Sequence, residues 1–248
     1  MSEETTDLFD LTGRVIAITG GGRGLGREMA AAFAARGARV AIASRKAEVC
    51  ARAATEIADA TGGEVIGLGL HVGRWDQCEP FVDTVAERLG PIDVLVNNAG
   101  SSPLYPSLGE VNEKLFDSVI GVNMKGPFRL SALVAERIVE RGAAGSIINV
   151  SSVAAVQPSA VEVPYAMAKS GLNTLTVAMA HMFGPHVRVN CIMPGPFHTD
   201  ISDAWDLEAF HEKARHDIPL QRGGEPGEIV GAALYLASDA SSYTTGSI

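Results

Sequence analysis

The sequence predicts an α/β fold with one doubly wound parallel sheet and helices on both of its faces, and two observations predict it. First, six short apolar runs rich in β-branched residues recur along the chain, at 15–19, 40–43, 65–70, 94–96, 147–150 and 187–192. Continuous apolar runs of this length are typical of strands buried on both faces. Second, the runs alternate with longer amphipathic segments, at 25–36, 46–60, 76–89, 112–141, 164–182 and 226–238. This alternation is typical of repeated βαβ units.

The whole chain, residues 1–248, is predicted to form a single domain. No linker rich in Pro, Gly or Ser and no low-complexity tract divides it, and α/β folds of this length often form one unit. One segment departs from the alternation. The segment 194–222 is long and mixed in polarity, and long segments between regular elements of a compact domain often cover a site. We therefore expect a substrate lid at 194–222.

Composition excludes several classes of function. The chain has 20 Lys and Arg residues against 29 Asp and Glu residues, for a formal net charge of −9. This balance argues against binding to nucleic acid or to a membrane surface. No run is long enough for a membrane span and the acidic start is unlike a signal peptide, so we expect a cytoplasmic protein. The three cysteines and six histidines lack metal-ligand spacing, and no metal is expected.

The first apolar run leads directly into the glycine turn, residues 20–26, which precedes a predicted helix. Its pattern is T-G-x-x-x-G-x-G, formed by Thr19, Gly20, Gly24 and Gly26. Glycine allows a sharp turn and close approach of the backbone, and a helix N-terminus offers free N–H groups to phosphate. The turn therefore predicts a site for a dinucleotide pyrophosphate, although a purely structural turn has the same composition.

Tyr165 and Lys169 lie four residues apart on a predicted helix, so both can point into one cleft. Pro164 suits the first turn of that helix and places Tyr165 near its positive end. An ammonium at about 4 Å, with an effective dielectric constant near 20, would favour the phenolate by about 4 kcal/mol. We therefore expect Lys169 to lower the pKa of Tyr165, by about three units before the desolvation of the lysine itself is subtracted. The alternative is an exposed helix pattern without function.

Further motifs stand in order along the chain: Asn97-Asn98-Ala99-Gly100, then Ser152, then Tyr165-x-x-x-Lys169, then Pro194-Gly195. Together with the glycine turn, they resemble the short-chain dehydrogenase/reductase family over nearly the whole chain. The segments 219–226 and 237–240 are similar to the branch that contains 3-oxoacyl-carrier-protein reductases and sugar dehydrogenases. The resemblance implies a Rossmann-type fold and hydride transfer between nicotinamide and a carbonyl or secondary alcohol carbon.

The resemblance also assigns roles to individual residues. Tyr165 is the acid in carbonyl reduction and the base in alcohol oxidation, and Lys169 also holds the nicotinamide ribose. Ser152 bonds to the substrate oxygen, and Asn123 positions a water that links Lys169 to solvent. The residues expected to contact the cofactor are Gly20, Arg23, Gly24, Leu25, Gly26, Ser44, Arg45, Val72, Asn98, Ala99, Gly100, Tyr165, Lys169, Pro194, Gly195 and Thr199.

The end of the second apolar run predicts the cofactor. NAD-selective folds of this kind usually carry Asp or Glu there, which accepts hydrogen bonds from the ribose 2′-hydroxyl. This chain has Ser44-Arg45 instead, and no carboxylate precedes Glu48. Arg45 and Arg23 can meet a 2′-phosphate through charge-assisted hydrogen bonds. We therefore predict NADP(H), with NAD(H) as the alternative.

Two departures from the family pattern affect these expectations. His71 precedes Val72 where many relatives carry an acidic residue that holds the adenine amino group. After Thr245 to Ile248 the family usually adds one more strand, so the final strand is expected to be absent. The resemblance further implies a homotetramer built from the helices 112–141 and 164–182.

Two alternatives to an NADP(H)-dependent reductase remain. The first is an NAD-linked sugar or polyol dehydrogenase. The second is a regulatory protein that binds the cofactor without turnover. Loss of Tyr165 or Lys169 would mark the regulatory protein, and both residues are present.

Overall fold

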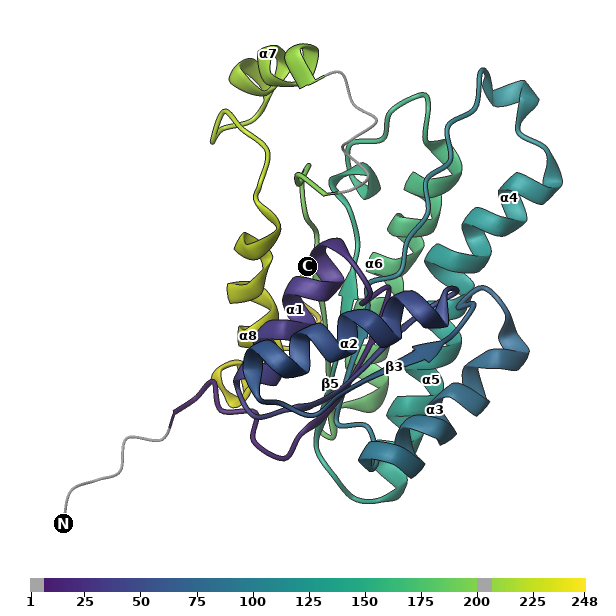
Figure 1. Ribbon diagram of the computed structural model, residues 1–248. Helices are drawn as coiled ribbons and strands as arrows, with labels where there is room; N and C mark the ends of the chain where they lie inside the picture. Colours follow the sequence, from purple (N-terminus) through teal and green to yellow (C-terminus); the bar gives the residue numbers. More distant parts are fainter. Residues whose placement is uncertain (1–6, 200–206) are drawn as a thin grey trace.

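A computed structural model describes residues 7–199 and 207–248. Its centre is a six-stranded parallel sheet in the order β3-β2-β1-β4-β5-β6 (Figure 1). The strands are β1 (Val15–Thr19), β2 (Arg39–Ser44), β3 (Val65–Gly69), β4 (Val94–Asn97), β5 (Gly145–Val150) and β6 (Val187–Ile192). The predicted fold class is confirmed. The strand order reverses between β1 and β4, and ligands of such sheets bind at the carboxyl ends of the strands there.

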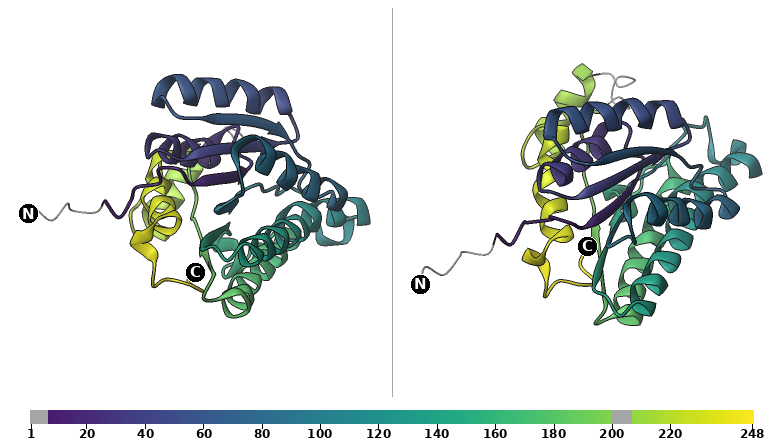
Figure 2. Two further views of the ribbon diagram at one scale, coloured as in Figure 1. Left: turned by 90° about the horizontal axis from the view of Figure 1, so that it is seen from below. Right: turned by 60° about the horizontal axis from the view of Figure 1, so that its bottom comes forward.

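Helices cover both faces of the sheet because alternate side chains of each strand point to opposite sides (Figure 2). In β1, Val15 and Ala17 join one apolar core, whereas Ile16 and Ile18 join the other. The first core is completed by α3 (Trp75–Leu89), α5 (Gly126–Glu140) and α6 (Val163–Phe183). The second core is completed by α1 (Gly24–Ala35), α2 (Ala47–Thr61) and α8 (Val230–Ala237).

The long helix expected at 112–141 is interrupted. It consists of α4 (Glu113–Ile120), a π-helical turn (Gly121–Lys125) and α5. Within this turn the Asn123 amide nitrogen donates to the carbonyl oxygen of Val119, at 2.8 Å. A side chain therefore binds a carbonyl that a regular helix reserves for the backbone, and π-turns of this kind are frequent at functional sites.

The expected lid segment is described only in part, because residues 200–206 lie outside the described residues. The helix α7 (Leu207–Asp217) follows them and lies beyond the carboxyl ends of the strands (Figure 1). At the other end of the chain, Gly246 donates to the Val189 carbonyl and Cys191 donates to the Ser247 carbonyl, each at 2.8 Å. Residues 246–247 thus run along the outer edge of β6. Within the described ranges, no helix is both long and apolar enough to cross a membrane.

Candidate active site

The glycine turn lies between β1 and α1, where side chains have no space. A Cβ on Gly20 would lie 2.9 Å from the Asn98 amide nitrogen, and a Cβ on Gly26 would overlap the Gly20 carbonyl oxygen. Gly20 and Gly24 also have φ values of 70° and 51°, which favour glycine. Helix α1 has no side-chain cap at its start. Its first N–H groups therefore suit a phosphate, and the turn fits the pyrophosphate of a dinucleotide.

The Asn98 stretch ties the glycine turn to β4. The backbone N–H groups of Asn98 and Ala99 both donate to the Thr19 hydroxyl, at 3.1 and 3.0 Å. The Asn98 side-chain amide donates to the Thr19 and Gly20 carbonyl oxygens, at 3.0 and 3.2 Å. The Asn98 side chain therefore holds the turn in place, and Ala99 is packed against Gly20.

The end of β2 lies close to the same turn. The Ser44 hydroxyl accepts from the Cys50 thiol at 3.1 Å, and a Cβ on Gly22 would lie 3.3 Å from the same sulfur. Arg45 and Arg23 are exposed beside this contact, one from each of the two segments. The structure thus places the two arginines on neighbouring segments.

Val72 and His71 follow β3. Val72 is 5% exposed and belongs to the apolar core, where its side chain packs against Gly126. The His71 backbone N–H donates to the Gln77 side chain at 2.8 Å. The His71 Nδ1 atom is buried and has no hydrogen-bond partner in the structure. The Val72 side chain is therefore part of the apolar core, and its role as a cofactor contact stays a prediction.

Ser152 and Tyr165 are brought together by β5 and α6. Ser152 follows β5 and caps a short 3-10 helix, Val153–Ala155, by accepting from Ala154 at 3.2 Å. Tyr165 lies in the first turn of α6, and its side chain is near enough to that of Ser152 for the serine to lower the phenol pKa. The neighbouring Ser151 is buried and its hydroxyl donates to the Lys169 carbonyl. Of the two serines, Ser152 is the one whose side chain influences the phenol pKa.

Lys169 lies under Tyr165. Its Nζ atom is 5.6 Å from the centre of the Tyr165 ring and donates to the Val150 carbonyl at 2.6 Å. Gly100 separates Lys169 from Asn123, because a Cβ on Gly100 would lie 3.8 Å from Nζ and 3.2 Å from the Asn123 Oδ1. Asn123 is fully buried and bonds to the backbone N–H and C=O of Ser101. The structure therefore gathers all four predicted catalytic residues.

The electrostatics correct the expectation for Tyr165. Burial raises its pKa above 10.0, and the side chain of Ser152 lowers it only in part, while the charge of Glu162 raises it. Burial also lowers the pKa of Lys169, to about 8. The expected lowering was wrong, because burial of the phenol, which disfavours the phenolate, is the largest influence on its pKa.

Pro194, Gly195 and Thr199 follow β6. The Val153 N–H donates to the Pro194 carbonyl at 3.1 Å, which joins this segment to the one that carries Ser152. A Cβ on Gly195 would meet no atom within 4 Å. Thr199 approaches the glycine turn, since a Cβ on Gly24 would lie 3.5 Å from its methyl group. Residues 194–199 thus span the catalytic and glycine-turn sides of the site. Within α1, Leu25 is partly buried and packs against the second apolar core.

Sequence reasoning missed a buried amide network beneath the site. Asn97 donates to Ser131 and to the Asn149 carbonyl oxygen, at 2.8 and 2.9 Å. Asn149 in turn donates to the Thr176 hydroxyl at 2.8 Å. These bonds join β4 and β5 to α5 and α6. Polar residues inside apolar runs were the available signal, since a buried polar group needs a partner.

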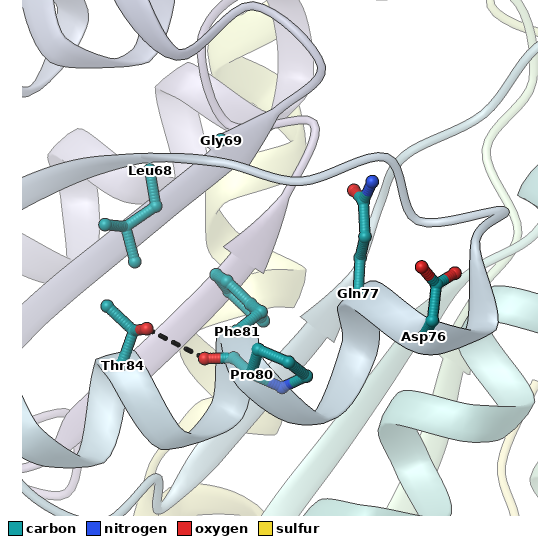
Figure 3. A pocket seen from close by; sticks show the side chains of 7 residues that line it. All are labelled: Leu68, Gly69, Asp76, Gln77, Pro80, Phe81 and Thr84. Atoms are coloured by element: carbon teal, nitrogen blue, oxygen red, sulfur yellow. Dashed lines mark hydrogen bonds between the residues drawn. The ribbon is translucent and has the colours of Figure 1, made fainter.

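A separate recess lies between β3 and α3 (Figure 3). The Thr84 hydroxyl donates to the Pro80 carbonyl at its rim, at 2.8 Å. The residues that line it are Leu68, Gly69, Asp76, Gln77, Pro80, Phe81 and Thr84. None of the predicted catalytic residues is among them, so the recess is distinct from the candidate active site.

Comparison with known proteins places this arrangement among oxidoreductases. A family model described as enoyl-(acyl carrier protein) reductase matches residues 20–248. The chain is 36% identical to an L-rhamnose 1-dehydrogenase (NAD(P)(+)) from Azotobacter vinelandii, covering 95% of this chain and 94% of that protein. It is also 36% identical to a 3-oxoacyl-(acyl-carrier-protein) reductase from Thermotoga maritima, covering 96% of each.

Solved structures agree with this placement. A putative short-chain alcohol dehydrogenase from Sinorhizobium meliloti superposes with a TM-score of 0.91 at 35% identity, covering 97% of this chain and 95% of that one. A 3-oxoacyl (acyl-carrier-protein) reductase from Agrobacterium tumefaciens with NADP bound superposes with a TM-score of 0.92 at 28% identity, covering 100% and 97%. The similarity therefore extends over the sheet, both helix layers and the segments around the site.

Proposed function

The chain belongs to the short-chain dehydrogenase/reductase family, and from this premise we propose that Ser152, Tyr165 and Lys169 perform its proton chemistry. The chain is an oxidoreductase that transfers hydride between a nicotinamide cofactor and a CH–OH or C=O carbon. One observation carries the residue assignment: the Tyr165 side chain is near that of Ser152, and its ring centre lies 5.6 Å from the buried Lys169 ammonium.

The bound nicotinamide supplies the hydride acceptor or donor. In reduction, the Tyr165 hydroxyl donates its proton to the substrate oxygen while the Ser152 hydroxyl donates a hydrogen bond to the same oxygen. The raised pKa of Tyr165 keeps the phenol protonated at neutral pH, which suits the acid role. Oxidation requires the phenolate as base, so the oxidative rate increases with pH.

NADP(H) is the preferred cofactor in this proposal. Support comes from the exposed Arg45 and Arg23 on neighbouring segments and from the absence of a carboxylate between β2 and Glu48. A solved reductase with NADP bound, similar over the full chain, adds support. The rhamnose dehydrogenase relative is named for both cofactors, so NAD(H) remains the alternative. Steady-state kinetics with both reduced cofactors, followed by nicotinamide absorbance, test the preference.

The substrate is proposed to be a carbonyl compound or secondary alcohol with an apolar substituent. The segments that flank Ser152 and Tyr165 expose Val156, Val161 and Leu104, at 60%, 51% and 78%. A sugar or polyol dehydrogenase is the second candidate, favoured by the rhamnose dehydrogenase relative. The two are separated by comparing kcat/KM for 2-alkanones of increasing length and 3-oxoacyl thioesters, in reduction, with that for aldoses and polyols, in oxidation. Higher values for the polyhydroxylated substrates favour the second candidate.

A homotetramer is proposed as the assembly. Helix α6 exposes Met167, Val177 and Met182, at 53%, 39% and 73%, on the side away from its own core. Apolar surface of this kind is commonly covered by another subunit. Sedimentation is expected to give a species near four times 25.9 kDa. A monomer alone at micromolar concentration would contradict this assembly.

A further inference from the structure

Tyr105 joins two segments beside the active site. It lies in the segment after β4, is 7% exposed, and its hydroxyl makes two hydrogen bonds. The hydroxyl accepts from the backbone N–H of Val163 at 2.7 Å and donates to the carbonyl of Ala160 at 3.1 Å. A single phenol oxygen therefore binds both the end of the segment 156–162 and the first residue of α6.

Helix α6 does not cap its own N-terminus. Its N-cap residue, Glu162, makes no side-chain bond to the helix backbone and accepts instead from the Ser159 hydroxyl, at 2.9 Å. Pro164, the second helical residue, has no N–H to satisfy. The Val163 N–H would be unpaired without the Tyr105 hydroxyl, and an unsatisfied helix end is costly. Tyr105 thus caps α6 from a distant part of the chain.

The same segment also contacts the other side of the site. Ser101, four residues before Tyr105, bonds through its backbone to both polar atoms of Asn123. Asn123 is next to Gly100, on whose other side Lys169 lies. Residues 101–105 therefore connect the Asn123 and Lys169 side of the site with the helix start that carries Tyr165.

We propose that Tyr105 is a positioning residue for Tyr165, because its hydroxyl fixes the first turn of α6 relative to Ser152 and Lys169. This inference rests on the proposed role of Tyr165. Tyr105 does not touch the reacting atoms in this proposal. It acts two residues upstream, where a small displacement of the helix start moves the Tyr165 hydroxyl relative to the substrate oxygen.

The test is Tyr105→Phe, which keeps the buried ring and removes both hydrogen bonds. We expect kcat to decrease by about 5- to 30-fold, with the KM for the cofactor unchanged because the glycine turn is not involved. The pH profile of kcat for alcohol oxidation should shift upward by about half a unit or more, because a displaced phenolate loses part of its stabilisation by Ser152. A purely structural role would not move this profile.

Tyr235→Phe is the matched control. The Tyr235 hydroxyl is bonded to the Thr244 hydroxyl at 2.7 Å, away from the site, and its loss should leave kcat and the pH profile unchanged. Wild-type kcat in Tyr105→Phe, or a decrease without a shift of the profile, would overturn the inference. If Tyr105→Phe does not fold, Val163→Pro removes the same donor from the helix side, and it must reproduce both effects.

Tyr165→Phe in the same assay separates this inference from the proposed function. If Tyr165→Phe remains active, the role of Tyr165 is wrong and the role of Tyr105 falls with it. If Tyr165→Phe is inactive while Tyr105→Phe matches the wild type, only the positioning role is wrong.

Discussion

The glycine turn and the catalytic group lie at the same end of the sheet but are built in opposite ways. The glycine turn works through its backbone: Gly20 and Gly26 have no room for a Cβ, and α1 begins without a side-chain cap. The catalytic group works through buried side chains, of which Lys169 and Asn123 are 2% and 0% exposed. One region excludes side chains to receive a ligand, and the other pays a desolvation cost to hold polar side chains in place.

The largest effect on kcat is expected from removing the proton that Tyr165 transfers. Tyr165→Phe keeps the ring and removes only the hydroxyl, so kcat should decrease by roughly three orders of magnitude. The fold and the cofactor Kd should not change, because the glycine turn that is expected to bind the cofactor pyrophosphate does not use the Tyr165 hydroxyl. Cofactor titration by fluorescence and single-turnover kinetics would measure both. A variant that retains more than about a tenth of the wild-type kcat would remove Tyr165 from the mechanism.

Lys169→Met tests the cost of burial on the catalytic side. Burial lowers the pKa of Lys169 from 10.5 to about 8, so the folded state binds a proton less tightly than the unfolded state. The wild type therefore gains stability relative to the methionine variant as pH rises from about 8 to 10.5. The gain should approach about 3 kcal/mol and should be absent below about pH 7.

Denaturant unfolding of both proteins across this pH range measures the difference. The difference between the two proteins removes the titrations of groups that do not interact with Lys169, because the two chains differ at one ionisable group. A difference in the free energy of unfolding that stays constant from pH 7 to pH 10.5 would show that the Lys169 pKa is close to its unfolded value.

These two regions also differ in how far the sequence predicts them. The glycine spacing and the Tyr165 to Lys169 spacing report local geometry, so the turn and the helix face follow from short-range rules. The pKa direction of Tyr165 does not follow from spacing, because desolvation depends on everything packed around the phenol. The Asn97 network and the Tyr105 cap join residues far apart in the chain, which no local pattern records.

Gly26→Ala and Gly195→Ala, compared as a pair, test whether the crowding around the glycine turn decides stability, because the first position is crowded and the second is open. A Cβ at Gly26 overlaps the Gly20 carbonyl oxygen and the Asn98 amide, so the turn must shift. We expect a loss of about 2 kcal/mol in the free energy of unfolding and weaker cofactor binding. A Cβ at Gly195 meets nothing within 4 Å, so its variant should stay within about 0.5 kcal/mol of the wild type. Equal losses at both positions would show that turn packing does not decide stability.

The smallest effect expected is the change of cofactor preference, which depends on a surface charge at the rim of the glycine side. Arg45 follows β2, and Ser44 is linked through Cys50 to the wall of the turn. An exposed guanidinium binds a phosphate through charge-assisted bonds that solvent weakens, so the preference for NADPH over NADH should be about tenfold or more in kcat/KM, near 1.4 kcal/mol. Arg45→Asp replaces the attraction by repulsion and offers an acceptor to the ribose 2′-hydroxyl, so the order of preference should reverse.

Lys46→Asp is the matched control, because it makes the same charge change one residue further along. The preference for NADPH should weaken in Lys46→Asp but not reverse, because general charge repels both cofactors and the more highly charged NADPH somewhat more, whereas Arg45 is proposed to contact the 2′-phosphate alone. Similar inversion by both variants would show that net charge, and not a contact from Arg45, selects the cofactor.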